Sequence, residues 1–329
     1  MKQAIETREL VVLNAAEGIV RGTYHKAYEE SSSSQSNPVE RNRIGVLFLN
    51  SLSPTRAADG DSAVYWADAF AELGYPSFRL DFQGFGDSDG EPPTELLNFV
   101  NTGGYASAAS TQINELVGRF NLSGVVIVGL CAGAVSALYA AGASKKCKGL
   151  VMMDPYFFLP LVAGLNVSQK LTRRILRTAP GRLMSRAYER MRKFGARLPG
   201  SSRPPSNANF PLLQCWKKVA SAGLPILVLQ APHTNFKVGD FDYLSYLLEL
   251  AGTKSQVVVS SIEGTGHSFS NRVGLVAVRQ QIENWLKAYF PLKKHAELGG
   301  NTLHSELDDN TVRNHATRIA CTANLSLGK

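Results

Sequence analysis

The sequence is poor in cysteine and in charge, and it has no apolar leader at its start. Four cysteines in 329 residues, none of them in a Cys-x-x-Cys pair, are too few for a disulfide-stapled scaffold and argue against a structural zinc site. Charged residues make up 19% and hydrophobic residues 44%, which excludes a disordered chain, a coiled coil and a collagen-like rod. The opening MKQAIETREL lacks the apolar core of a signal peptide. We therefore expect a globular, cytoplasmic protein with free thiols.

One long stretch without charge, residues 124–143, has the hydropathy of a membrane span. Its composition changes halfway, because the β-branched run at 125–128 is followed at Gly129 by small, Ala-rich helix formers. A buried strand followed by a buried helix has the same hydropathy as a span. We interpret the stretch as these two elements.

Positive charge is concentrated in residues 170–203, which carry eleven Lys and Arg residues and a single acid, Glu189, in a chain of net charge +8. Helical residues four apart share a face, so the spacing predicts cationic stripes that dock an anionic partner. We expect this partner to be CoA or an acidic acyl carrier protein, with an anionic membrane surface as the rival. Few aromatics and no recognition motif accompany the charge, so we expect no nucleic-acid partner. The predicted docking residues are Arg173, Arg177, Arg182, Arg186 and Arg190.

Strand and helix patterns alternate along most of the chain, which predicts a parallel sheet with right-handed crossovers and helices on both faces. Apolar runs at 10–13 and 18–23 predict an opening antiparallel pair. The other predicted strands are 44–49, 77–81, 125–128, 149–153, 226–229 and 256–260, and the predicted helices are 62–73, 102–120, 133–143, 240–250 and 273–289.

The alternation stops after Asp154, and about seventy residues follow that are apolar, then basic, then rich in Pro, Ser and Asn. We interpret this interruption as a helical basic cap, residues 155–222, inserted between two parts of the core, 1–154 and 223–291. Residues 292–329 have weak periodicity, which is typical of a loosely attached or disordered extension.

The segment Gly129-Leu130-Cys131-Ala132-Gly133 has the pattern of a nucleophile elbow with cysteine in the central position. A strand that turns abruptly into a helix lifts the central side chain clear of the sheet, and small flanking residues let neighbouring backbone pass. The amides at the start of the helix stabilise a thiolate and later an oxyanion. We therefore predict that Cys131 is a nucleophile rather than a small buried hydrophobe.

His267 is the predicted base, because it follows the last strand and precedes the final helix, in the chain order nucleophile, acid, histidine. We expect His25, on an early strand, and the histidines of the tail to be solvated. The histidines are scattered with no pair at ligand spacing, so we expect no metal. We expect no cofactor either.

The acid of the triad is expected a few residues after the strand at 225–230, where no carboxylate occurs before Asp240. We predict Asp240, with Asn235 and Asp242 as alternatives and Asp154, after an earlier strand, as an outsider. An asparagine can serve, because a Cys–His pair needs its third member mainly to orient the ring.

Two segments complete the predicted site. Ser51 and Leu52 follow the strand at 44–49, where a backbone N–H can form an oxyanion hole with that of Ala132. The loop at 81–90, DFQGFGDSDG, has glycines but not the spacing of a dinucleotide fingerprint, so we do not expect a Rossmann enzyme.

Four motifs in this order, LDFQGFGDSDG, VGLCAGA, GLVMMDP and GTGHSFS, resemble the α/β-hydrolase superfamily over about residues 44–289. In its elbow cysteine and its Arg-rich segment, the chain resembles the hydrolases associated with the bacterial exosortase system. The chain departs from the family pattern at Gln83, where an arginine is usual, and in lacking Gly-x-Asp after the acid-bearing strand.

We expect acyl transfer from a CoA or carrier-protein thioester to Cys131, and from there to an amine, an alcohol or water. Exchange of one thioester for another is nearly thermoneutral, which favours such substrates. The alternatives are an ester or lactone hydrolase and, in another class, a degenerate binding module that keeps the fold.

Overall fold

A computed structural model describes residues 7–15, 18–28, 43–49, 55–159, 204–232, 237–238 and 241–292 of the chain. Its centre is a sheet of eight strands in the order β1-β2-β4-β3-β5-β6-β7-β10. In this sheet β4, β3, β5, β6, β7 and β10 run parallel. Strands β1 and β2 form an antiparallel pair, and β2 also joins β4 antiparallel. The strands are β1 (Arg8–Ala15), β2 (Gly18–His25), β3 (Ile44–Leu49), β4 (Ser77–Leu80), β5 (Gly124–Leu130), β6 (Cys147–Met153), β7 (Pro225–Gln230) and β10 (Gln256–Ser261).

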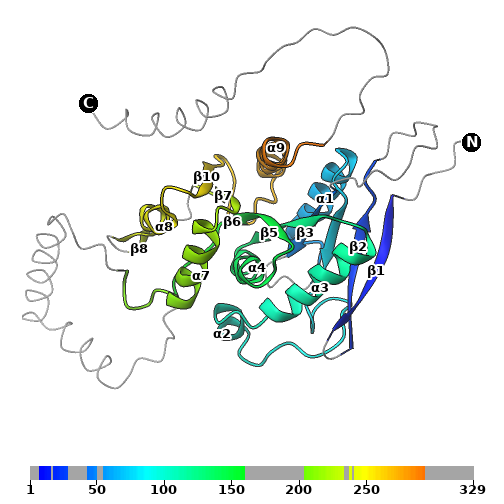
Figure 1. Cartoon of the computed structure of the whole chain (residues 1–329), viewed down its shortest axis with the longest axis horizontal. Helices are drawn as coiled ribbons and strands as arrows, with labels where there is room; N and C mark the ends of the chain where they lie inside the picture. The colour runs from blue at the N-terminus through cyan, green and yellow to red at the C-terminus, as the bar shows by residue number, and fades with distance from the viewer. Residues whose placement is uncertain are drawn as a thin grey trace, which may run out of the picture. The chain divides into compact units, whose positions relative to one another are not determined.

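Helices cover both faces of this sheet, as the alternating pattern predicted (Figure 1). On one face lie α1 (Ser62–Glu72) and α9 (Arg272–Tyr289). The other face carries α2 (Leu96–Asn101), α3 (Ala106–Arg119), α4 (Ala132–Ala143), α7 (Phe210–Ser221) and α8 (Tyr243–Ala251). The 3-10 helix η1 (Asp59–Asp61) precedes α1, and two short strands, β8 (Lys237–Val238) and β9 (Phe241–Asp242), pair just before α8.

The central strand β5 shows why its sequence is continuously apolar. Successive side chains of a strand point to opposite faces, so a strand covered on both sides needs an apolar residue at every position. Val125 and Ile127 accordingly pack with α3, α4 and α7, whereas Val126 and Val128 pack with α1 and α9. The uncharged stretch 124–143 is thus β5 and α4, as expected. Among the helices that the structure describes, none has both the length and the apolar composition needed to cross a membrane.

The structure corrects the predicted boundary of the inserted cap. Helix α7, which we had placed inside it, packs on α4 and buries Trp216, whose Nε1 donates to the Leu247 carbonyl at 2.8 Å. The helix begins where Asn209 accepts a hydrogen bond from the Leu212 amide. The sequence signal was present, since Asn-Phe-Pro before an amphipathic run is a helix start.

The chain leaves and rejoins the core at a single point. Phe158 forms an antiparallel bridge with Ala208, and the Leu159 amide donates to the Asn207 carbonyl at 2.7 Å. Residues 160–203, including the basic segment, lie between these ends and outside the described residues, as do residues 293–329. A helical cap and a C-terminal extension therefore remain predictions. Helix α2 and the short pair β8–β9 were not predicted.

Candidate active site

Cys131 lies between β5 and α4 in a backbone conformation that few residues adopt, with φ 54° and ψ −115°. A non-glycine residue at positive φ is strained, and such strain is characteristic of a nucleophile elbow. The turn also requires glycine at position 129, because a Cβ there would lie 2.4 Å from the Gly133 carbonyl oxygen. The strand, the turn and the helix are thus arranged as the sequence predicted.

The Cys131 side chain is half-buried, whereas that of Cys147 is buried. Cys147 is fully buried, and burial raises the pKa of its thiol to about 12. Burial likewise raises the pKa of Cys215 to about 11. Because the thiolate is the reactive form, these two side chains are poor nucleophiles near neutral pH. Cys321 lies outside the described residues.

His267 lies in the loop between β10 and α9 and makes contact with two side chains from other segments. Its Nδ1 is 3.0 Å from Asp154 Oδ2, and the Cys131 side chain lies close enough to the ring to raise its pKa. Since Nδ1 is taken by the carboxylate, Nε2 is the nitrogen left for the sulfur. The Asp154 bond, followed by the Cys131 side chain, raises the pKa of His267 to about 10. This favours the imidazolium, the form that stabilises a thiolate.

Asp154 follows β6 directly, has a positive φ of 42°, and its side chain is 0% exposed. Its backbone amide donates to the Leu229 carbonyl, and its Oδ1 accepts from the Ala231 amide at 2.8 Å. One carboxylate oxygen is therefore held by the end of β7, while the other faces His267. A buried carboxylate with both oxygens engaged is a rigid support for the ring.

The carboxylate beside His267 is thus that of Asp154, the least favoured of our four candidates for the acid, where we had predicted Asp240. Asp240 and Asn235 lie outside the described residues. The Asp242 carboxylate caps α8, since it accepts hydrogen bonds from the Leu244 and Ser245 amides. Our expectation assumed that the acid must follow β7, but β6 lies between β5 and β7, so its end is nearer to the elbow. The available signal was Asp154-Pro155 directly after the apolar run at 149–153.

Of the residues expected to form the oxyanion hole, Ala132 is among those that the structure describes. Ala132, the first residue of α4, is buried immediately after Cys131, where helix amides are free of intrahelical partners. Ser51 and Leu52 lie outside the described residues, so their part in such a hole remains a prediction.

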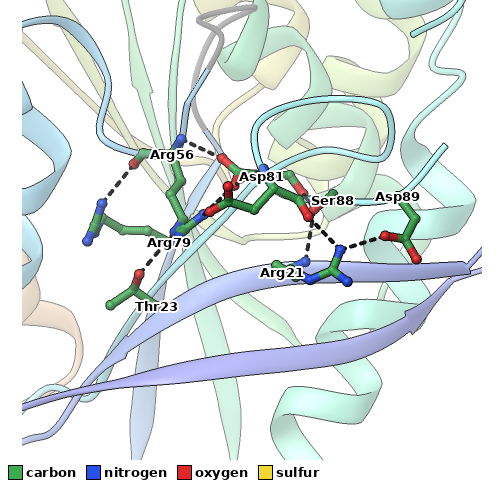
Figure 2. A network of polar contacts seen from close by, with 8 residues as sticks. Arg21, Thr23, Arg56, Arg79, Asp81, Ser88 and Asp89 are labelled. Atoms are coloured by element: carbon green, nitrogen blue, oxygen red, sulfur yellow. Dashed lines mark hydrogen bonds and ion pairs between the residues drawn. The ribbon is translucent and has the colours of Figure 1, made fainter. Parts of the chain in front are cut away.

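The glycine-rich loop after β4 is tied to the core by ion pairs that the sequence did not reveal (Figure 2). Asp81 accepts from the Arg56 amide at 2.5 Å and binds the Arg56 guanidinium, which also contacts Asp87 at 2.7 Å. In the same loop, Ser88 and Asp89 bind Arg21 of β2. Arg56, from a separate segment, thus supplies a cation to the loop in which Gln83 replaces the usual arginine.

His25 is 1% exposed, so our expectation that it is solvated was wrong. Its Nδ1 is 2.7 Å from Asp68 Oδ1, and its Nε2 accepts from Arg79 Nε at 2.8 Å. Burial, followed by the charge of Arg79, lowers the pKa of His25 to about 4 despite the nearby carboxylate. Asp68 of α1 lies against His25 of β2 here, and the sequence pattern of this strand did not reveal that cover.

The described residues contain no group of three His, Cys, Asp or Glu side chains arranged to hold a metal ion. The basic residues Arg173, Arg177, Arg182, Arg186 and Arg190 lie outside the described residues. What the structure brings together is a cysteine, an aspartate and a histidine, which follow one another in the chain as Cys131, Asp154 and His267.

Comparison with solved structures agrees with this geometry at the level of the fold. An esterase of Pyrococcus furiosus, Pf2001, is 14% identical, with a TM-score of 0.55 over 86% of this chain and 92% of its own. A thermostable carboxyl esterase of Bacillus coagulans is 11% identical, with a TM-score of 0.52 over 86% of this chain and 99% of its own. An alpha-beta serine hydrolase homologue of Coxiella burnetii is 14% identical, with a TM-score of 0.50 over 86% and 99%.

A search of curated proteins gives no match. Residues 46–278 match the pattern described as the alpha/beta hydrolase family, a range that contains the elbow, Asp154 and His267. The range covers well over half of the chain. With the strand order and the elbow, this match shows that the chain belongs to the alpha/beta hydrolase family.

Proposed function

We propose that this protein hydrolyses an acyl ester through an S-acyl intermediate on Cys131, with His267 as the base and Asp154 as the residue that orients it. The observation that carries the proposal is the meeting of three side chains from three segments. Cys131 follows β5, Asp154 follows β6, and His267 follows β10, yet Asp154 binds the His267 ring and Cys131 lies close enough to raise the pKa of that ring. Such a constellation is recognised by its geometry rather than by its sequence order.

The reaction has two balanced steps. In the first, Cys131 Sγ forms a bond to the acyl carbon, the bond from that carbon to the leaving oxygen breaks, and His267 Nε2 gives its proton to that oxygen. In the second, water attacks the acyl carbon and gives a proton to His267, while the carbon–sulfur bond breaks and releases the acid. The amide of Ala132 stabilises the oxyanion in both steps, with Ser51 or Leu52 as the source of the second donor.

The choice of an ester and of water is supported by the family match and by two solved structures of this fold whose names describe esterases. A sulfur nucleophile supports a second candidate, an acyl thioester. Exchange between thioesters is nearly thermoneutral, and the S-acyl enzyme is also a donor to amines and alcohols. Transfer from CoA or a carrier protein is therefore the main rival to ester hydrolysis.

Intact-mass measurement after mixing with an oxyester and a thioester of the same acyl group tests both candidates. We expect the acyl mass to appear on wild type and to disappear in Cys131→Ala, with free acid as the product. Iodoacetamide near neutral pH should label Cys131 in preference to Cys147 and Cys215, whose pKa values are raised by burial. Hydrolysis that survives in Cys131→Ala would contradict the proposal. An acyl group that remains until an amine or alcohol is added would favour transfer.

We also propose that the basic segment, residues 170–203, docks an anionic partner, in the first place CoA or an acyl carrier protein. The support is one acid among eleven bases, which leaves mutual repulsion uncompensated. Arg182→Glu with Arg186→Glu should slow association with a carrier-linked substrate and flatten its salt dependence. Turnover of a short uncharged ester should not change. If the variant loses only its binding to anionic vesicles, the partner is a membrane surface.

The resemblance to exosortase-associated hydrolases remains part of this proposal. It is supported by the cysteine in the elbow and by the arginine-rich segment, both read from the sequence. This resemblance agrees with an acyl substrate that is bound to a carrier protein. The Arg182→Glu with Arg186→Glu variant tests that carrier-bound substrate as well.

A further inference from the structure

His267 stands on a loop, residues 262–271, that connects β10 to α9. About half of its side chain is exposed to solvent, and its ring is held at 3.0 Å by the Asp154 carboxylate. Packing in the core therefore does not fix this ring. Its distance from Asp154 depends on how the backbone of the loop is held.

The two ends of this loop are fastened to each other and to the sheet. Asn271 is the N-cap of α9 and accepts a hydrogen bond from the Gly274 amide at 2.8 Å. Its Nδ2 donates to the Gly264 carbonyl, also at 2.8 Å, so one side chain both caps the helix and closes the loop. At the start of the loop, the Ile262 amide donates to the Gln230 carbonyl of β7 at 2.8 Å.

Phe269, two residues after His267, anchors the middle of the loop. Its side chain is completely buried in the core between the sheet, α1 and α9. Its φ is 53°, which is strained for a residue with a side chain, and such strain persists where the surrounding structure enforces it. Its amide donates to the Gly266 carbonyl at 3.0 Å, which closes the tight turn that contains His267.

Gly274, in the first turn of α9, is where this anchored loop comes closest to the helix. A Cβ at this position would lie 2.3 Å from Thr265 Oγ1, 2.8 Å from the Phe269 carbonyl oxygen and 2.9 Å from Asn271 Oδ1. A hydroxyl can turn away from such a contact, but the backbone carbonyl moves only if the loop moves. Glycine is less favourable than alanine within a helix, so α9 gives up helix propensity here. What it gains is the close approach of the segments on both sides of His267.

We propose that Gly274 is a positioning residue for the catalytic histidine: its bare backbone is the surface against which the loop packs, close enough to α9 for the His267 ring to reach Asp154. Asn271 holds the loop closed over this surface. The inference rests on the proposed function, in which His267 is the base, and both residues act through His267. A side chain at position 274 displaces the Phe269 carbonyl, and a displacement of about 1 Å can cost about a hundredfold in rate.

The test compares Gly274→Ala with Gly118→Ala. Gly118 is the matched control, because it also lies in a helix, α3, and a Cβ there meets no atom within 4 Å. We expect Gly274→Ala to lower kcat for an oxyester about 10- to 100-fold and to change KM less than about threefold, since the chemical step depends on the placement of the ring. Gly118→Ala should keep the wild-type kcat. A wild-type kcat in Gly274→Ala, or equal losses in the two variants, would overturn the assignment.

Titration of the His267 ring by NMR measures the positioning without any substrate. Because the Asp154 bond is the largest cause of the raised pKa, Gly274→Ala should move the pKa of His267 from about 10 toward its ordinary value of about 6.5. Gly118→Ala should leave it unchanged. A lowered kcat with an unchanged His267 pKa would overturn the positioning role. If wild type forms no S-acyl enzyme and yet the His267 pKa falls in Gly274→Ala, the proposed function fails and the positioning role stands.

Asn271→Ser provides a second variant if Gly274→Ala does not fold. Serine still caps the helix but loses the donor to the Gly264 carbonyl. Since Asn271 is exposed, we expect a melting temperature near that of wild type, a kcat about 3- to 10-fold lower and a lowered His267 pKa. Asn209→Ser is the matched control, because Asn209 caps α7 and donates to the carbonyl of another segment in the same way, and it should leave the His267 pKa unchanged. A wild-type kcat and His267 pKa in Asn271→Ser would overturn the proposal.

Discussion

Two histidine–aspartate pairs in the described part of the chain have similar geometry and opposite behaviour. His267 Nδ1 lies 3.0 Å from Asp154, and His25 Nδ1 lies 2.7 Å from Asp68. The carboxylate binds the same ring nitrogen in both pairs. Yet the pKa of His267 is raised to about 10, whereas that of His25 is lowered to about 4.

The difference comes from what surrounds the ring beyond its carboxylate. The side chain of His267 is 51% exposed and its aspartate 0%, while His25 is 1% exposed and its aspartate 31%. The second nitrogen of His25 accepts a hydrogen bond from Arg79, which a protonated ring cannot do, so this ring is neutral. Near His267 lies the Cys131 side chain instead, which adds to the raised pKa of this ring.

A His–Asp pair is therefore not by itself a catalytic device. Burial and a guanidinium keep the ring of one pair neutral, whereas the Asp154 carboxylate and a nearby cysteine raise the pKa of the more exposed ring in the other. The following experiments break or sharpen this contrast.

The largest effect is expected from Asp154→Asn compared with Asp68→Asn. In the first variant the amide favours the wrong tautomer of His267, so we expect roughly a 10³- to 10⁴-fold loss of kcat. The second variant should keep activity within about twofold, because the described partners of Asp68 are His25 and Arg8, and its cost should appear in stability as about 1–3 kcal/mol. Ester turnover and denaturant unfolding measure the two effects. Similar activities in the two variants would remove Asp154 from the site.

The second experiment separates the two causes of the raised His267 pKa. Replacing Asp154 by Asn should lower this pKa from about 10 most, because the Asp154 bond is its largest cause, and Cys131→Ala should lower it less. Titration of the ring protons by NMR measures both, with His25 as the internal reference that should stay near 4. A larger effect of Cys131→Ala than of Asp154→Asn would reverse this order of causes.

The smallest effect concerns stability against pH. A histidine whose pKa is lowered in the folded state contributes stability that is present above its unfolded value of about 6.5 and is lost as the pH falls through about 4. We expect His25 to account for about 1–3 kcal/mol of acid destabilisation over this window, and His25→Gln to flatten that part of the profile. The raised pKa of His267 has the opposite sign, since its contribution is present below 6.5 and is lost as the pH rises through about 10. A profile of His25→Gln parallel to wild type from pH 7 to 4 would contradict this account.

The predictable parts of the fold were those that depend on local pattern. The eight strands of the sheet and five of the helices were predicted because an apolar run or a helical period recurs over several residues in each. Helix α2 was missed because it has only six residues, and α7 was assigned to the cap because a proline- and serine-rich segment precedes it. The elbow was predictable because one short segment contains the strand end, the small residues and the helix start.

The sequence by itself determined that this is an alternating α/β chain with Cys131 at a strand-to-helix turn and His267 before the last helix. Only the tertiary structure decided which carboxylate binds His267, which histidine is buried, and that Arg56 supplies the cation for the loop at 81–90. Periodicity records how each residue relates to its near neighbours along the chain. Strand order and helix packing determine which strand ends meet, and the pairs that set protonation here join residues 43 to 113 positions apart.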